Sequence, residues 1–300
     1  MKLEGEVAIV AGGGQGIGEG IVKCLAEEGA NIAVVDINGD IANKVADEVE
    51  AMERKALAIT ADLTNDDEVT RVVKETVDFF GKIDILVNCV GGISRETMEL
   101  MIADRTAAAD EPLPAFMSFN SEVWDRYYRL NLKSHVMLSH AVTPHFMKQK
   151  SGKIVNISSD SGRLPDPGHM PYAAMKAGDI SITWSLARAL APYNVTVNCI
   201  CPGFVYTPLW ARGATAMLEQ VRIAKAQGKE LPAGSTAEDI DLEGMTPKEF
   251  WERFIALPAI PLGREQTPED MGRAVVFFVS EDAKNVTGQV LHVNGGMVMR

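Results

Sequence analysis

The sequence predicts an α/β fold, with a doubly wound parallel sheet of about seven strands and helices on both faces. Short apolar runs alternate with longer amphipathic stretches, which is typical of strands alternating with helices. The apolar runs are hydrophobic at nearly every position, which indicates strands buried on both faces. Nearly half of the 300 residues are hydrophobic, enough for a large core, so we expect one domain over residues 1–300.

Seven β-branched and aliphatic segments are predicted to be strands. They are 6–11, 31–36, 56–60, 83–90, 153–158, 195–200 and 289–294. Six amphipathic segments between them are predicted to be helices. They are 17–28, 41–53, 66–80, 122–148, 172–191 and 268–280.

Two segments interrupt this alternation, at 92–121 and 204–266. Each is far longer than the connection of about 2 to 6 residues that is usual in such folds. Both follow predicted strand ends, and ligands of open α/β sheets bind beyond the carboxyl ends of the strands. We therefore expect both segments to form substrate-side loops or a lid. In the second segment, we expect Phe204 and Trp210 to lie near the substrate. Their apolar residues could equally pack added helices against the body or against another subunit.

Composition and charge exclude several classes of function. The formal charge is −12 with no dense basic run, so nucleic acid is not an expected partner. No apolar run reaches membrane length and no signal-peptide cleavage pattern is present, so we expect a cytoplasmic protein without membrane contact. The spacings of histidine and cysteine predict no metal site. The four cysteines lie in apolar surroundings, which favours buried structural thiols.

A glycine-rich turn joins the first predicted strand to the first helix. The segment "AGGGQGIGEG" contains Gly12, Gly16 and Gly18, with Gln15 and Ile17 between them. Glycine lets a backbone turn sharply and approach a pyrophosphate, and a helix amino end offers free N–H donors with a partial positive charge. A tight structural turn is the alternative for this pattern alone. In its context, the turn predicts a dinucleotide site.

Asp36, at the end of the second predicted strand, indicates which dinucleotide binds. A carboxylate at this distance from the glycine turn accepts hydrogen bonds from the adenosine ribose hydroxyls. The same charge repels a 2′-phosphate. The residues that follow Asp36, Ile37 to Gly39, contain no arginine or lysine to pair with that phosphate. NAD is therefore favoured over NADP.

The segment "PYAAMKAG" sets Tyr172 and Lys176 four residues apart on a predicted helix, so that both share one face. A free tyrosine has a pKa near 10 and is a poor base at neutral pH. An ammonium about 4 Å away supplies roughly 4 kcal/mol in favour of the phenolate at an effective dielectric constant near 20. We therefore expect Lys176 to lower the pKa of Tyr172 by about 3 units. Tyrosine then becomes a usable acid and base.

Taken together, these motifs resemble the short-chain dehydrogenase/reductase family. Its G-x-x-x-G-x-G turn and Y-x-x-x-K pair are both present, and further matches follow in order along nearly the whole chain outside the two long segments. They are "ADL" with Asp62 and Leu63, "VNCVGG" with Asn88 and Gly91, "NLKS" with Asn131, "IVNISSDSG" with Ser159, and "CPGFVYTP" with Pro202, Gly203, Val205 and Thr207. The resemblance implies a Rossmann fold. The sequence departs from the family at "NCVG", where "NNAG" is commoner, so we expect Cys89 and Val90 to fill the space of the usual asparagine and alanine.

The resemblance also implies residue roles. Tyr172 would be the acid/base, Ser159 the hydroxyl that holds the substrate oxygen, and Lys176 both a tuner of Tyr172 and a ribose contact. Asn131 would anchor a water that connects Lys176 to solvent. Ser158 is the rival to Ser159, which fits the family pattern better.

The remaining matches imply contacts with the cofactor. Asp62 would meet adenine, Asn88 would steady the central strand, and Val205 and Thr207 would bind the nicotinamide carboxamide. Gly91, Leu63, Pro202 and Gly203 would complete the cofactor site.

The predicted reaction is hydride transfer between NAD and a secondary alcohol or ketone. Arg163 and His169 lie between Ser159 and Tyr172, where they could contact substrate or belong to a solvated loop. One alternative is a reductase of 3-oxoacyl thioesters, and another is a dinucleotide-binding regulator without turnover. The resemblance further implies a homotetramer that packs through the helices around 122–148 and 172–191, with the carboxyl tail near another interface.

Overall fold

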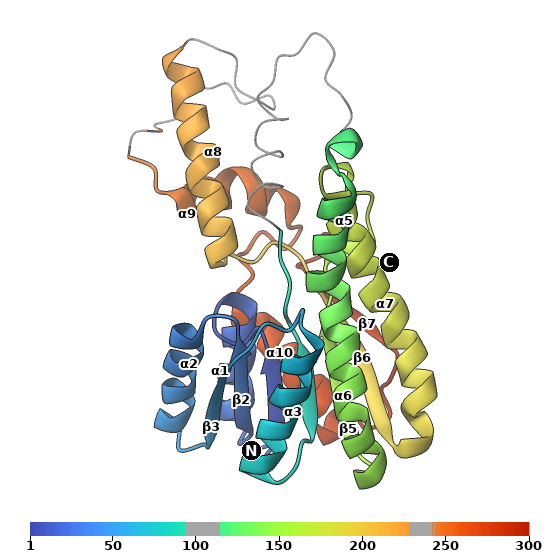
Figure 1. Ribbon diagram of the computed structural model, residues 1–300. Helices are drawn as coiled ribbons and strands as arrows, with labels where there is room; N and C mark the ends of the chain where they lie inside the picture. Colours follow the sequence, from blue (N-terminus) through green and yellow to red (C-terminus); the bar gives the residue numbers. More distant parts are fainter. Residues whose placement is uncertain (94–114, 228–241, 243, 300) are drawn as a thin grey trace.

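A computed structural model of the chain describes residues 1–93, 115–227, 242 and 244–299. It contains a seven-stranded sheet of order β3-β2-β1-β4-β5-β6-β7 in which every neighbouring pair is parallel. The order reverses between β1 and β4, which is the crossover of a doubly wound fold. The predicted Rossmann fold class is therefore confirmed (Figure 1).

The strands lie within two residues of their predicted positions at either end, and β4 is shorter by two residues at both ends. Their bounds are β1 Val7–Ala11, β2 Asn31–Asp36, β3 Ala56–Thr60, β4 Ile85–Asn88, β5 Gly152–Ile157, β6 Val195–Pro202 and β7 Val290–Val293. Every residue of β1 and β4 is buried. Full burial explains why these runs are continuously apolar instead of alternating.

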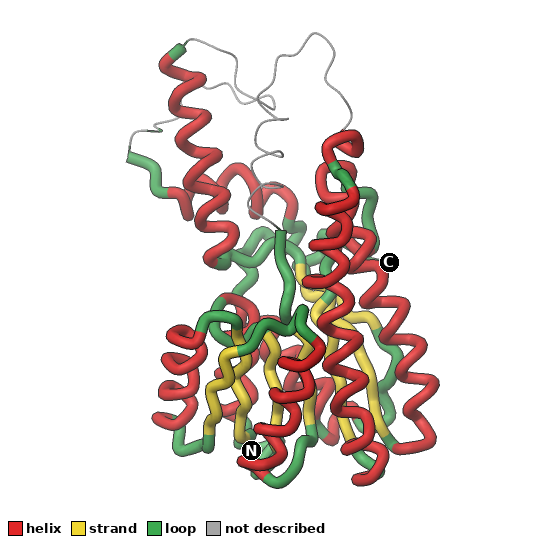
Figure 2. The backbone as a smooth tube through the Cα atoms, in the orientation of Figure 1, coloured by secondary structure: helices red, strands yellow, loops and turns green. Residues whose placement is uncertain are grey.

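Helices cover both faces of the sheet, as Figure 2 shows. One face carries α1 Gly16–Glu27, α2 Gly39–Ala51 and α10 Pro268–Val279; the other carries α3 Asp66–Phe80, α6 Ser134–Gln149 and α7 Met170–Leu190. Side chains from the two faces of the same strands divide between two cores. Ala8 and Val10 of β1 pack with α1 and α10, whereas Ile9 packs with α3 and α6.

The predicted helix over 122–148 is three consecutive pieces. It begins as α5 Ser121–Tyr128, passes through a π-helical turn over Arg129–Lys133 and continues as α6. The π turn contains Asn131, a residue of the candidate site. Such turns widen a helix locally and occur often at functional sites.

The described part of 204–266 is largely helical, where the sequence led us to expect loops or a lid. It contains α8 Pro208–Ala226 and α9 Pro247–Trp251, followed by a π turn over Glu252–Ala256. Figure 1 shows α8 and α9 beyond the end of the sheet. Because α8 starts soon after β6 ends, these helices lie at the edge of the sheet where the strands have their carboxyl ends. Of the first long segment, 94–114 lies outside the described residues.

Across the described residues, we find no helix whose length and apolar content would suit a membrane crossing.

Candidate active site

A cleft with a volume of about 720 Å³ opens at the carboxyl edge of the sheet. Its walls come from the segments that follow β1 through β6, together with α7 and the start of α8. Most of the predicted site residues line it. They are Gly12, Gln15, Gly16, Ile17, Gly18, Asp36, Asp62, Leu63, Gly91, Ser159, His169, Tyr172, Lys176, Pro202, Gly203, Phe204, Val205, Thr207 and Trp210.

The glycine turn is packed so tightly that side chains would not fit. A Cβ at Gly18 would lie 1.9 Å from the carbonyl oxygen of Gly12, and one at Gly12 would lie 3.1 Å from the backbone of Cys89. Gly12 and Gly16 also have φ angles of 76° and 58°, which favour glycine. No side chain caps the amino end of α1. We call the turn Gly12–Gly18, including the start of α1, the glycine cradle. The free N–H groups at the amino end of α1 fit a dinucleotide pyrophosphate.

Asp36 ends β2 beside this cradle. Its Oδ2 accepts a hydrogen bond from the backbone N–H of Gly14 at 3.1 Å, and its Oδ1 accepts one from the N–H of Asn38, also at 3.1 Å. The carboxylate is thereby fixed at the rim of the cleft. Its remaining lone pairs are available to ribose hydroxyls.

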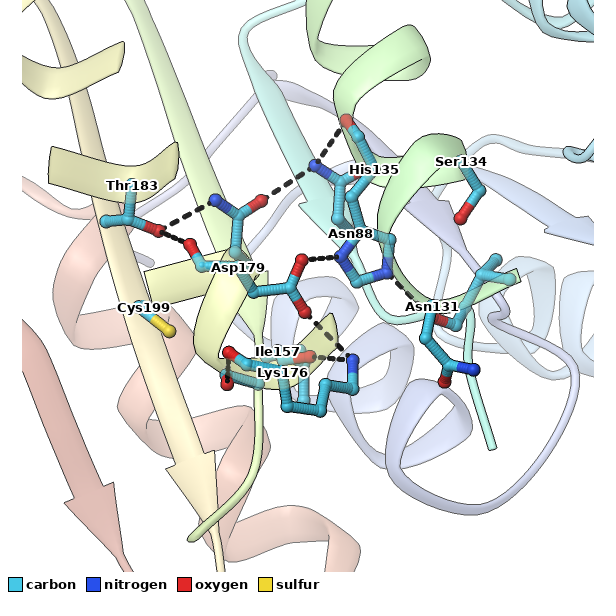
Figure 3. Close-up of polar contacts among 12 residues, drawn as sticks. Asn88, Asn131, Ser134, His135, Ile157, Lys176, Asp179, Thr183 and Cys199 are labelled. Atoms are coloured by element: carbon cyan, nitrogen blue, oxygen red, sulfur yellow. Dashed lines mark hydrogen bonds and ion pairs between the residues drawn. The ribbon is translucent and has the colours of Figure 1, made fainter. Parts of the chain in front are cut away.

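Tyr172, Ser159 and Lys176 meet on the opposite wall. Ser159 follows β5, and its hydroxyl lies close enough to the Tyr172 phenol to lower the pKa of that phenol. The Lys176 Nζ lies 5.9 Å from the centroid of the Tyr172 ring. It also donates to the carbonyl of Ile157 at 2.8 Å and to Asp179 Oδ2 at 3.0 Å (Figure 3). Lys176 is therefore fixed beside Tyr172, and Ser159 lies on the same wall of the cleft.

The expectation that Lys176 makes Tyr172 acidic is wrong for the polypeptide alone. Burial raises the pKa of Tyr172 above its ordinary value of 10.0, and this outweighs the opposing effects of Lys176 and Ser159. Asp179 adds to the rise, because its charge offsets part of that on Lys176. Helical spacing predicted the position of the ammonium but neither the burial nor the carboxylate beside it.

The two candidate serines differ in what their hydroxyls bind. Ser158 is buried, and its Oγ donates to the backbone carbonyl of Lys176 at 2.7 Å. Ser159 accepts from the N–H of Ser161 at 3.2 Å and faces Tyr172. The geometry therefore favours Ser159 as the hydroxyl available to a substrate.

Three predicted site residues do not line the cleft: Asn88, Asn131 and Arg163. Asn88 donates to Asn156 Oδ1 at 2.8 Å and to Ser139 Oγ at 3.0 Å, which ties β4 to β5 and α6. Asn131 is fully buried, and its Oδ1 accepts from the N–H of Gly92 at 2.8 Å. Both asparagines thus hold the backbone that forms the cleft.

The predicted substrate residues form a mixed wall. His169 Nδ1 contacts Asp166 Oδ1 at 2.8 Å, so this histidine belongs to a local polar cluster at the rim. Phe204 and Trp210 stack edge to face with centroids 5.3 Å apart, and Trp251 lies behind Trp210. The apolar residues of the second long segment therefore both line the cleft and pack against one another. Met98, Leu100, Met101 and Ile102 of the first lie outside the described residues.

Two polar groups beside the site were not predicted from the sequence. Asp160, next to Ser159, accepts from Asn294 at 2.8 Å and contacts His292 at 2.7 Å, which anchors the loop after β5 to β7. Asp179 contacts His135 Nδ1 at 2.9 Å as well as Lys176. An aspartate three residues after Lys176 on a helix was the available signal for this second group.

Cysteine burial differs from the expectation at one position. Cys24, Cys199 and Cys201 are buried free thiols, whereas Cys89 is half-buried and lines the cleft. Desolvation raises the pKa of Cys89 to about 12, although Lys176 acts in the opposite direction. The thiol is therefore protonated and of low reactivity at neutral pH. Within the described ranges, no group of three potential metal ligands occurs.

The fold and the cleft are those of a nucleotide-binding oxidoreductase, and comparison with known proteins identifies the family. The short chain dehydrogenase profile matches residues 6–217, and a profile described as enoyl-(acyl carrier protein) reductase matches 248–298. The chain belongs to the short-chain dehydrogenase/reductase family, and it is an oxidoreductase of that family.

Its relatives include several dehydrogenases and reductases. A 3-oxoacyl-[acyl-carrier-protein] reductase of Thermotoga maritima is 31% identical over the whole of both chains. The (2S)-[(R)-hydroxy(phenyl)methyl]succinyl-CoA dehydrogenase subunit BbsD of Thauera aromatica is 31% identical over 99% of this chain and 98% of the relative.

Among solved structures, a 7α-hydroxysteroid dehydrogenase complexed with NADH and 7-oxo glycochenodeoxycholic acid has a TM-score of 0.74 and 30% identity. That match covers 100% of this chain and 96% of the other.

Proposed function

We propose that this protein transfers a hydride between NAD and a secondary alcohol or ketone. The observation that carries the proposal is the convergence of Ser159, Tyr172 and Lys176 on one wall of a cleft whose other end holds the glycine cradle and Asp36. In this proposal NAD, when bound, accepts or returns the hydride. The polypeptide supplies orientation and proton handling.

In the direction of oxidation, the Tyr172 oxygen takes the hydroxyl proton of the alcohol. Ser159 donates a hydrogen bond to the same substrate oxygen and holds it beside the phenol. Lys176 stabilises the phenolate while its own position is fixed by Ile157 and Asp179. The positive charge of an oxidised nicotinamide would act on Tyr172 in the same direction as Lys176 and oppose the effect of burial.

NAD rather than NADP is part of the proposal. Asp36 places a negative charge at the rim, and among the described residues that line the cleft no arginine or lysine stands near it. A 2′-phosphate would therefore meet repulsion without a compensating partner.

A 3-oxoacyl thioester is the second candidate substrate, and the names of the relatives support it. It is compatible with the same chemistry, because its 3-oxo group is itself a ketone. Thioester carriers bring phosphate groups, and Arg212 of α8 is an exposed cation on the cleft wall. The regulator alternative is less well supported, because these named relatives are enzymes.

A substrate panel tests the proposal directly. The purified protein is assayed with NAD(H) and NADP(H) against 3-oxoacyl thioesters, cyclic alcohols and aryl alcohols, and cofactor absorbance at 340 nm is the readout, as is usual for nicotinamides. We expect turnover with NAD(H) and at least one class. Absence of turnover across all classes would contradict the proposed function.

Tyr172→Phe tests the role of the phenol. We expect kcat to fall by at least about 1,000-fold, because general acid–base catalysis contributes roughly that much. NAD affinity measured by calorimetry should change little, since the aromatic ring remains. A variant that keeps wild-type kcat would refute the role of Tyr172.

We further propose that residues 1–300 form one domain, with the described helices of 204–266 forming a wall over the substrate. A homotetramer is also proposed. Its support here is the exposure of Trp184, 48% accessible, on α7, one of the two long helices expected to pack between subunits.

A further inference from the structure

A chain of buried polar contacts runs from Lys176 into the body of the protein (Figure 3). Lys176 Nζ donates to Asp179 Oδ2 at 3.0 Å, and Asp179 Oδ1 contacts His135 Nδ1 at 2.9 Å. At the far end, His135 Nε2 lies 2.6 Å from the carbonyl oxygen of Val90. His135 and Asp179 are 3% and 1% exposed, so the middle of this chain is shielded from solvent.

The hydrogen-bond partners of His135 determine where its protons lie. A backbone carbonyl only accepts, so Nε2 must carry a proton toward Val90. Nδ1 faces a carboxylate, which also accepts when ionised. Burial opposes ionisation of Asp179, but the Lys176 ammonium, 3.0 Å from Oδ2, helps to hold the pKa of this carboxyl below its ordinary range. Asp179 is therefore ionised, and a proton on Nδ1 is required to make that contact attractive.

This assignment fixes the charge of the cluster. Lys176 and Asp179 alone would sum to zero, and the Tyr172 phenol would lose most of the field of the ammonium. With His135 as an imidazolium, the three groups together carry one positive charge. Asp179 then immobilises Lys176 without cancelling the charge that a phenolate needs.

We propose that His135 and Asp179 are positioning residues for the reaction, in which His135 keeps the buried cluster net positive and Asp179 holds Lys176 against Tyr172. The inference rests on the proposed function, because it assigns these residues to the acid/base step at Tyr172. Neither side chain lines the cleft, so both act through Lys176.

Among the described residues, the other groups that face Tyr172 do not supply this charge. Ser159 and Tyr127 are neutral partners, the latter with its ring centroid 6.5 Å away. Cys89 contributes only a protonated thiol, since desolvation raises its pKa to about 12. Cys199 of β6 also lies near Asp179 and Lys176, and its thiol pKa is raised as well, by its neighbour Cys201 and by burial.

The test compares the pH dependence of kcat for alcohol oxidation in matched variants. His135→Asn keeps an amide N–H near the Nδ1 position but removes the positive charge, so the cluster becomes neutral. We expect the acidic limb of kcat, where Tyr172 must lose its proton, to move up by about 1 pH unit. The double variant His135→Asn/Asp179→Asn removes one charge of each sign and leaves Lys176 positive. Its acidic limb should return toward that of the wild type.

His140→Asn is the matched control, because His140 is an exposed histidine on the same helix, α6. Its profile should coincide with that of the wild type. An unshifted limb in His135→Asn, or a double variant shifted as far as the single one, would overturn the inference. If both residues had a purely structural role, the variants would lose kcat through poorer packing. The acidic limb would then not move up in His135→Asn and back down in the double variant.

A second measurement is independent of turnover and of variant folding. Histidine-labelled wild-type protein is examined by ¹⁵N–¹H NMR in mildly alkaline buffer, with His135→Asn used only to assign the resonance. We expect protons on both ring nitrogens of His135. An unprotonated Nδ1 would overturn the inference even if the enzyme is active. If the protein oxidises no alcohol, by contrast, the proposed function is contradicted. The NMR result then decides the inference about His135.

Discussion

Asp36 uses both carboxylate oxygens to organise its own surroundings at the rim of the cleft. The bond from the Gly14 N–H joins it to the glycine cradle, and the bond from the Asn38 N–H fixes the start of α2. A side chain held in this way presents its charge in one place. Cofactor choice can therefore depend on a single residue.

Asp36→Ala is expected to lower kcat/KM for NAD by roughly 10- to 100-fold, since hydrogen bonds to a charged group are worth about 1.5–3 kcal/mol. The kcat/KM for NADP should fall less or rise, because the repulsion of a 2′-phosphate is removed. Steady-state kinetics with both cofactors measure this ratio. Asp40→Ala, which removes an exposed acid from the first turn of α2, is the control. An unchanged ratio in Asp36→Ala would contradict the proposed preference for NAD.

The raised pKa of Tyr172 couples cofactor binding to pH. The free protein keeps the phenol protonated up to and beyond pH 10.0. A bound, positively charged nicotinamide favours the phenolate and so lowers that pKa. Between the lowered and the raised pKa, binding of NAD⁺ releases a proton and its Kd should fall by up to about tenfold per pH unit.

Calorimetry of NAD⁺ binding across this pH range measures the effect. Tyr172→Phe has no proton to release, and NADH carries no ring charge, so both should give nearly flat profiles. If wild-type NAD⁺ binding were equally flat, Tyr172 would not be the group beside the nicotinamide.

Most of the site residues predicted from the sequence line the cleft, because motif spacing fixes them on strand ends and on one helix face. The sequence did not predict Asp179 and His135, which come from different helices and meet only through packing. It also did not predict the direction of the Tyr172 pKa, since burial depends on the whole assembly of elements.

Among the elements, α1 and α10 approach each other closely through glycines. A Cβ at Gly20 would lie 2.5 Å from the Cβ of Pro268 and 2.6 Å from its carbonyl carbon, and one at Gly272 would lie 2.6 Å from the Sγ of Cys24. The contact brings the last helix onto the first. This contact therefore joins the carboxyl-terminal part of the fold to α1, the helix that follows the glycine cradle.

Gly20→Ala should lower the free energy of unfolding by about 2 kcal/mol, because the added methyl group meets backbone atoms that cannot move aside easily. Urea denaturation followed by circular dichroism measures the change. Gly168→Ala is the matched control, since its Cβ would meet nothing within 4 Å. Equal stability of the two variants would show that α10 shifts freely.

The π turn over Arg129–Lys133 is one of the elements that sequence reasoning missed. The pattern over 122–148 is that of a continuous helix, and its residues carry no signal for one widened turn. In the structure this turn places Asn131 so that its Oδ1 reaches the N–H of Gly92. The strands, by contrast, were predicted within two residues at either end, because complete burial leaves a continuous apolar run.

For the whole molecule, the exposed large side chains mark faces that the monomer leaves uncovered. Trp184 projects from α7, and Phe277 and Leu291 are 41% and 38% exposed on α10 and β7. The expected tetramer would use α7 and the carboxyl tail. The positions of these side chains agree with that proposal.

Trp184→Glu is expected to disrupt the assembly, because a charge in an apolar interface core is strongly unfavourable. Sedimentation velocity should show a smaller species than for the wild type. Phe79→Glu on α3, where Phe79 is 54% exposed, is the control and should leave the assembly intact. A wild-type protein that sediments as a monomer would refute the tetramer itself.

The residues proposed for the redox chemistry and those proposed for substrate contact come from different parts of the fold. Tyr172, Ser159 and the glycine cradle rest on strand ends and helices of the sheet, whereas Phe204 and Trp210 come from the added segment after β6. Exchanging that segment between relatives would therefore transplant a preference for one compound over another while the redox machinery stays in place. New specificities could then arise by replacing one modular insert, without rebuilding the scaffold.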